Sequence, residues 1–144
     1  MNATRLAERL ARCGERLLER RCSTLEGYRL AFDKVSSQQD WVGYANVVPA
    51  TGCRVEGTLN AMSPKAIETL DAIELVPHHY HRVRVLVRDA ATGTRLAAFT
   101  YVANPGMVRP NLKPTRDYIE HLLAGADVLP GSYLDALRSV ECWS

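Results

Sequence analysis

Long apolar segments are absent from this 144-residue sequence. No run approaches the roughly 20 apolar residues that a helix needs to cross a bilayer, so we expect no membrane insertion. The sequence also has no C-x-x-C pair and no recognisable secretory leader. We therefore expect a cytoplasmic protein whose cysteines stay reduced. These are Cys13, Cys22, Cys53 and Cys142.

A strong excess of charge of one sign is also missing. The chain has 18 lysine and arginine residues against 16 aspartate and glutamate residues, which gives 18 − 16 = +2. The densest basic stretch, Arg16–Arg21, alternates with leucine and glutamate, which is typical of the solvated face of a strand or helix. Because nucleic-acid binding requires a concentrated basic surface, we expect no nucleic-acid partner.

Motifs for nucleophilic and metal-dependent catalysis are missing as well. There is no G-x-S-x-G motif of a serine hydrolase, and no cysteine lies in a nucleophile motif. His79 and His81 would project to the same side of a strand, but no further ligand is near them in the sequence, and a zinc site needs three or four. We interpret them, with His78, as ordinary histidines at a strand entry and expect no metal or other cofactor.

The sequence does contain enough apolar residues, 47%, for one globular domain over residues 1–144. Sequential strands with inserted and appended helices predict an α+β fold with a small, mostly antiparallel β-barrel. The predicted helices cover residues 2–13, 64–75, 114–123 and 130–140. The predicted strands cover residues 15–21, 28–34, 42–48, 53–59, 79–87 and 95–103, although 15–21 also fits a longer first helix.

Three short stretches carry the residues typical of turns between antiparallel strands. They are Leu25–Gly27, Pro49–Gly52 and Asp89–Gly93, and each ends in glycine. We therefore expect a turn at Leu25–Gly27 between the strands 15–21 and 28–34, and hairpins at Pro49–Gly52 and Asp89–Gly93.

Glu74 lies in the apolar stripe of the predicted helix at 64–75 rather than on its polar side. Ser63 and Pro64 mark the start of this helix, and Pro77 ends it. One interpretation is a solvated charge on a frayed helix end. The other is a carboxyl group facing an apolar interior, where its pKa would rise toward the range useful for proton transfer, and Asp71 would raise it further by repulsion.

Three tyrosines follow places where a strand or loop meets a helix. Tyr80, Tyr101 and Tyr118 each have a phenol that can hydrogen-bond a polar ligand inside an apolar pocket. The simpler alternative for any one of them is partly buried packing with the hydroxyl in water.

Together these residues resemble the γ-glutamylcyclotransferase family along nearly the whole chain. No single piece is specific, but their order and spacing are. The matching pieces are Leu25–Phe32, Trp41–Val48, Val55–Gly57, Leu70–Glu74, Tyr80, Tyr101–Asn104, Pro114–Tyr118 and Gly125–Ala126.

The resemblance implies an enzyme of the amine-lyase type that needs no cofactor. The α-amine of a small γ-glutamyl substrate attacks its own γ-carbonyl, which forms 5-oxoproline and releases an amine. Glu74 matches the acid/base residue of the family, Tyr101 matches a tyrosine that lines the substrate site, and Tyr80 and Tyr118 match aromatic positions near it. The leaving amine would belong to an amino acid, a simple amine or a protected pathway intermediate.

The sequence departs from the family pattern at two places. Family members begin with a strand and a Y-G-S-N turn whose amides cradle the substrate, whereas Met1–Arg5 resembles the family's segment just after that turn. We include Met1 and Asn2 among the expected substrate-binding residues. Either translation starts upstream of Met1, or the protein has lost part of its site together with an inner strand. A lost strand would leave an open sheet edge, which allows a homodimer. Leu75 stands where the family usually has glycine, so its side chain would narrow the pocket mouth or shift the glutamate.

These departures keep a second hypothesis open. The chain would then be a catalytically inactive member of the same fold that binds a small acid or a partner protein.

Overall fold

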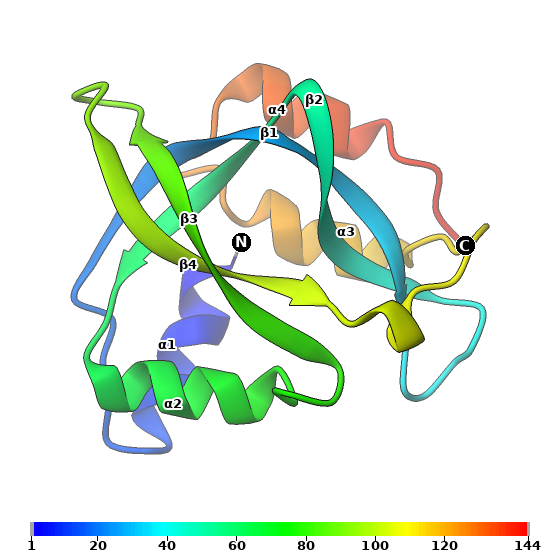
Figure 1. Ribbon diagram of the computed structural model, residues 1–144, viewed down its shortest axis with the longest axis horizontal. Helices are drawn as coiled ribbons and strands as arrows, with labels where there is room; N and C mark the ends of the chain where they lie inside the picture. Colours follow the sequence, from blue (N-terminus) through cyan, green and yellow to red (C-terminus); the bar gives the residue numbers. More distant parts are fainter. Residues whose placement is uncertain (1, 144) are drawn as a thin grey trace.

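The computed structural model describes residues 2–143 and consists of one sheet with helices around it (Figure 1). In chain order the helices are α1 (Ala3–Ala11), α2 (Pro64–Ile73), the short 3-10 helix η1 (Pro105–Met107), α3 (Arg116–Leu123) and α4 (Gly131–Arg138). The strands are β1 (Glu19–Val35), β2 (Gly43–Ala61), β3 (Tyr80–Asp89) and β4 (Arg95–Ala103). No helix among the described residues is long and apolar enough to span a membrane.

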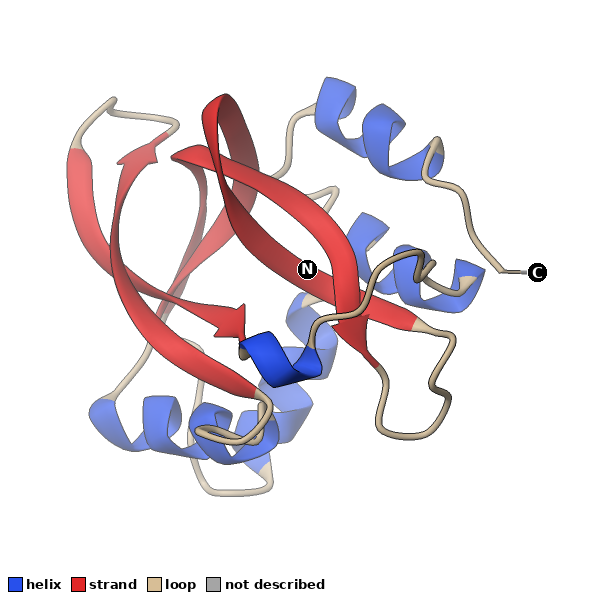
Figure 2. Ribbon diagram, turned by 45° about the vertical axis from the view of Figure 1, so that its right-hand side comes forward, coloured by secondary structure: helices blue, strands red, loops and turns tan. Residues whose placement is uncertain are grey.

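The four strands are antiparallel and follow the order β2-β1-β3-β4. They curl toward a barrel, as Figure 2 shows, which confirms the predicted α+β class. Within residues 2–143 no ladder closes the sheet between β2 and β4. One side chain links these two strands, since Asn46 Oδ1 of β2 accepts a hydrogen bond of 2.9 Å from the amide of Ala103 in β4.

The turn predicted at Leu25–Gly27 and the hairpin predicted at Pro49–Gly52 are wrong, because the chain continues through both stretches as bent strands. Glu26 pairs with Arg54, but the next pair is Tyr28 with Pro49, so the register shifts around Gly27. Gly27 has φ +78° and Gly52 has φ +80°, a left-handed conformation that glycine adopts at little cost. The same residues that favour a tight turn also favour a bulge, and here the two glycine-containing stretches face each other across one ladder. The hairpin predicted at Asp89–Gly93, between β3 and β4, is confirmed.

The helix boundaries follow their capping residues. Asn2 caps α1 by accepting from the amide of Arg5 at 3.0 Å, and Ser63 caps α2 by accepting from the amide of Ala66 at 3.0 Å. The predicted strand at 15–21 begins only at Glu19. Before it, the chain turns at Gly14, which has φ +72°.

Two apolar clusters hold the fold together. Leu25, Val55, Val85 and Val87 fill the inside of the curled sheet. A second cluster packs α1 against α2 through Leu6, Leu10 and Ala66, and each fully buried leucine contributes about 1.5–3 kcal/mol. The second cluster fixes the two helices side by side at one end of the molecule, where the candidate site lies (Figure 1).

Candidate active site

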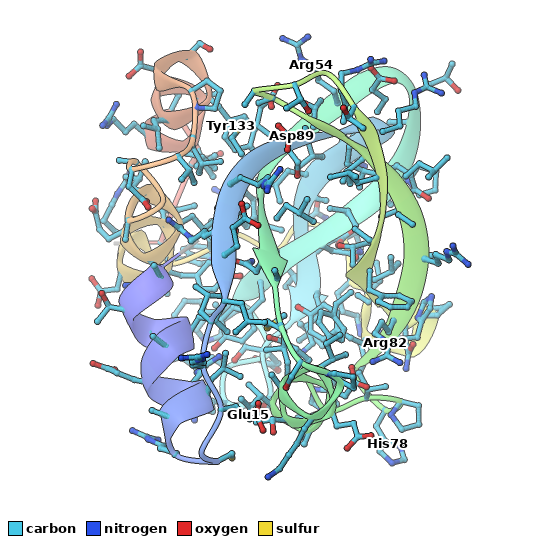
Figure 3. All side chains as sticks on the ribbon, turned by 90° about the vertical axis from the view of Figure 1, so that its left-hand side faces the viewer. Glu15, Arg54, His78, Arg82, Asp89 and Tyr133 are labelled. Atoms are coloured by element: carbon cyan, nitrogen blue, oxygen red, sulfur yellow. The ribbon has the colours of Figure 1, made fainter. Side chains whose placement is uncertain are left out.

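A cavity of about 1170 Å³ opens between α1, the end of α2, the sheet and α3. Figure 3 shows Arg82 and His78 at this end of the molecule, where α2 gives way to β3. Every described residue that the sequence predicts for the site lines this cavity: Asn2, Glu74, Tyr80, Tyr101 and Tyr118. Met1 lies outside the described residues.

Glu74 occupies the C-cap position of α2, where its amide donates to the carbonyl of Leu70 at 2.9 Å. Its side chain is half-buried, and none of the described residues donates a hydrogen bond to its carboxyl group. Burial raises the pKa of Glu74, while the positive charges of Arg9, Lys34 and Arg5 lower it by a smaller amount. The structure therefore favours the second sequence interpretation, a carboxyl group held in the cavity and open to a ligand.

Asp71 does not act as the sequence predicts. It accepts hydrogen bonds from the hydroxyl of Tyr101 at 2.6 Å and from Arg82 Nη1 at 2.9 Å. The guanidinium balances its charge, and burial rather than repulsion by Asp71 is the main reason for the raised pKa of Glu74. Asp71 instead fixes the hydroxyl of Tyr101 on the wall of the cavity.

Tyr80 and Tyr118 hold the same peptide group of β2. The hydroxyl of Tyr80 donates to the carbonyl of Ala45 at 3.0 Å, and the amide of Ala45 donates to the hydroxyl of Tyr118 at 3.1 Å. Burial raises the pKa of Tyr118 to about 12, so both phenols stay neutral at ordinary pH. The hydroxyl of Tyr80 is thus used as a donor, whereas that of Tyr118 only accepts and keeps its own O–H for a ligand.

Tyr80 is 9% exposed although strand alternation groups it with the exposed Arg82. It is the first residue of β3, and its hydroxyl reaches across to β2. Position at the strand end, rather than alternation, decides its burial.

Leu75 follows Glu74 in a left-handed conformation, with φ +54°. This is the conformation that commonly ends a helix and that glycine adopts most easily. Its side chain is 48% exposed at the cavity wall, so it gains little packing in return. Leu75 therefore stands at a position whose backbone conformation suits the glycine that is usual in the family.

The histidines do not gather around a common point. His79 Nδ1 lies 3.1 Å from Lys34 Nζ, and His81 Nδ1 lies 2.7 Å from Asn104 Oδ1. Among residues 2–143 no group of three His, Cys, Asp or Glu side chains is placed to hold a metal ion.

Lys34 is a cavity residue that sequence reasoning missed. It is 3% exposed, and its ammonium lies 5.6 Å from the ring centre of Tyr44 and 5.4 Å from that of Tyr80. The register of β1 and β2 shifts between Ala31 and Lys34, so simple alternation along the strand could not place this side chain.

A family model for the AIG2-like family matches residues 54–137, that is 137 − 54 + 1 = 84 residues and more than half of the chain. The chain belongs to the AIG2-like family. The matched region contains α2, Glu74 and all three predicted site tyrosines, so the family assignment rests on the part that builds most of the cavity. No curated protein matches the chain.

Solved structures show the same fold. A structure named gamma-glutamyl cyclotransferase has a TM-score of 0.82 and 19% identity, with 99% of this chain and 83% of that chain covered. The uncharacterized protein loc79017 from Homo sapiens has a TM-score of 0.80 and 19% identity, with 100% and 87% covered. YkqA from Bacillus subtilis has a TM-score of 0.68 and 18% identity, with 85% and 45% covered. The AIG2-like family and the γ-glutamylcyclotransferase fold predicted from the sequence are thus confirmed.

Proposed function

We propose that this AIG2-like protein is a γ-glutamylcyclotransferase. It would convert a γ-glutamyl amino acid or γ-glutamylamine into 5-oxoproline and a free amine. The observation that carries the proposal is Glu74, a half-buried carboxyl group with a raised pKa and no protein hydrogen-bond donor among the described residues, in a cavity rimmed by tyrosine rings. The fold shared with a structure named gamma-glutamyl cyclotransferase supports the same reaction.

In this reaction Glu74 takes a proton from the substrate's α-ammonium. The freed amine attacks the γ-carbonyl carbon, so that a new C–N bond closes the five-membered ring. The tetrahedral oxyanion then collapses and the bond to the leaving nitrogen breaks. Glu74 returns its proton to that nitrogen and relays to it the second proton of the attacking nitrogen, so that a neutral lactam and an ammonium are released. No water is consumed and no covalent enzyme intermediate forms, so one carboxyl group suffices.

The raised pKa of Glu74 matters for both proton transfers. A carboxylate with an ordinary pKa is a weak base toward an ammonium group. A higher pKa of the carboxyl group reduces the difference in proton affinity between the two groups. The positive charges of Arg9, Lys34 and Arg5 lower the pKa of Glu74 and so favour the ionised form that begins the cycle.

The proposal includes a cytoplasmic location. It rests on cysteines that all remain free in the described part of the chain, as is usual in a reducing compartment.

Release of 5-oxoproline from a panel of γ-glutamyl compounds tests the proposal. The panel contains γ-glutamyl amino acids, γ-glutamylamines and a longer γ-glutamyl-protected amine, and the full chain is checked for folding by circular dichroism. Release from at least one class supports the proposal and names the leaving amine. If a folded protein releases no 5-oxoproline from any compound of the panel, the proposal is overturned in favour of a binding module.

A further inference from the structure

Lys34 is almost completely buried and yet has no carboxylate partner. Among residues 2–143 no aspartate or glutamate oxygen lies within 4 Å of its Nζ, and its one hydrogen-bond partner is His79 Nδ1 at 3.1 Å. Two arginines of the sheet do have carboxylate partners, Arg21 with Asp89 and Arg82 with Asp71. A buried charge without a counter-ion is costly, which indicates that a ligand supplies the missing anion.

Burial lowers the pKa of Lys34, and its neighbours partly oppose this shift. Two tyrosine rings face the ammonium, and Glu74 lies near enough to raise the pKa that burial lowers. An ammonium group can only donate, so Nδ1 of His79 accepts and the ring carries its proton on Nε2. A lysine ammonium has three donors, and the one toward His79 leaves others for a ligand.

Lys34 and Glu74 line the same cavity with opposite charges. They interact through space without forming an ion pair within 4 Å. An amino-acid head group carries a carboxylate and an ammonium on one carbon atom, so it fits between a cation and an anion arranged in this way. With its carboxylate on Lys34, such a group presents its nitrogen toward Glu74.

We propose that Lys34 binds the α-carboxylate of the γ-glutamyl group and so directs the α-nitrogen to Glu74. The inference rests on the proposed function for the identity of the substrate. It assigns Lys34 to the part that all γ-glutamyl compounds share, so the residue acts the same way whatever the leaving amine is. It also gives the buried lysine the counter-ion that the described residues do not provide.

Arg5 and Arg9 are the competing cations, because both line the cavity from α1 and both act on Glu74. Arg5 is exposed and Arg9 is half-buried, so water screens them more than it screens Lys34. If they held the carboxylate, removal of the lysine charge would leave carboxylate binding intact.

Calorimetry with two probes tests the inference without any turnover. The probes are 5-oxoproline, which keeps the carboxylate, and its uncharged carboxamide. We expect the wild-type protein to bind 5-oxoproline about tenfold to hundredfold more tightly than the carboxamide, as for a hydrogen bond to a charged group. Lys34→Met should abolish this preference, whereas Lys65→Met, at an exposed lysine on α2 outside the cavity, should preserve it.

Lys34→Met is expected to fold, because it removes a buried charge and keeps a side chain of similar length. A preference that survives in Lys34→Met, or a wild-type protein that does not distinguish the two probes, overturns the inference. The two experiments can also give different answers. If the preference depends on Lys34 but the protein releases no 5-oxoproline from the panel, the carboxylate site is upheld and the proposed cyclisation is overturned. The two proposals can therefore fail separately.

Discussion

Asp89 and Glu74 are two carboxyl groups at opposite ends of β3 whose surroundings differ. Figure 3 shows Asp89 at one end of the sheet, and Arg82 and His78 mark the other end, where Glu74 follows α2. Asp89 is 0% exposed and accepts hydrogen bonds from Arg21 at 2.6 Å and from the amides of Ala91 and Thr92 at 2.8 and 3.2 Å. Glu74 accepts none from the described residues.

The difference appears in the direction of each pKa shift. The hydrogen bond from Arg21, aided by the amide of Ala91, lowers the pKa of Asp89, whereas burial raises the pKa of Glu74. Burial alone therefore does not identify a functional carboxyl group. A carboxyl group that accepts hydrogen bonds from its neighbours, such as Asp89, closes a turn. A carboxyl group in a cavity without such donors, such as Glu74, is available for proton transfer.

The largest expected effect is on activity. Glu74→Gln keeps the shape of the side chain and removes the proton carrier, so kcat should fall at least about hundredfold with little change in KM. Steady-state release of 5-oxoproline from the best panel substrate measures this. Glu68→Gln, at an exposed position on the same helix, is the matched control and should keep wild-type rates. Equal rates for both variants would remove Glu74 from the mechanism.

Asp89→Ala should have the opposite profile, with a large loss of stability. It leaves the guanidinium of Arg21 without its buried partner and two turn amides without an acceptor, so Tm should fall by roughly 5–10 °C. Thermal unfolding followed by circular dichroism measures the change. Asp135→Ala, which removes an exposed ion pair with Arg138, should hardly change Tm. Equal Tm values for the two variants would mean that Asp89 does not stabilise the fold as proposed.

The pH dependence of stability should differ in sign between the two groups. The folded-state pKa of Asp89 is lowered, so its contribution is present above the unfolded pKa of about 3.9 and is lost as the pH falls through the folded value. The folded-state pKa of Glu74 is raised, so its contribution is present below the unfolded pKa of about 4.3 and is lost as the pH rises through the folded value.

Glu74→Gln should consequently stabilise the protein at neutral and higher pH. We expect its Tm to exceed that of the wild type by roughly 2–5 °C at about pH 8, and the difference to vanish at about pH 3.5, where the carboxyl group is protonated in both states. Melting curves across this range measure the effect. A Tm lower than that of the wild type at about pH 8 would show that the ionised carboxylate is stabilised by the fold.

The smallest expected effect concerns the backbone beside Glu74. Leu75→Gly relieves a left-handed conformation at an exposed side chain, so it should stabilise the protein by about 0.5–1 kcal/mol. Denaturant unfolding measures the free energy. Leu86→Gly, at an exposed position in β3, is the control and should destabilise, because glycine weakens a strand interior. A loss of stability in Leu75→Gly would indicate that the leucine packs at the cavity mouth.

The position of Glu74 was predictable because residues that start and end a helix lie on either side of it. Ser63 and Pro64 fix the start of α2 and Pro77 limits its end, so helical periodicity alone places the carboxyl group on the apolar side. The hairpin at Asp89–Gly93 was predictable for the same reason.

The bends at Gly27 and Gly52 and the burial of Lys34 were not predictable in this way. A glycine-containing stretch has the same local chemistry whether the chain reverses or only bulges, and the partner strand decides between the two. Lys34 faces the cavity because the register shifts just before it, which is a property of two strands together. The pairing of Asp71 with Arg82 likewise depends on how α2 lies against β3.

A pH titration by carboxyl-carbon NMR, with Glu74 and Asp89 assigned in the same sample, tests the central claim most directly. We predict that Glu74 titrates above the ordinary glutamate pKa of 4.5 and Asp89 below the ordinary aspartate pKa of 3.8. A Glu74 that titrates at or below 4.5 would contradict the account, because its carboxyl group would then be held as an ordinary anion rather than kept available for proton transfer.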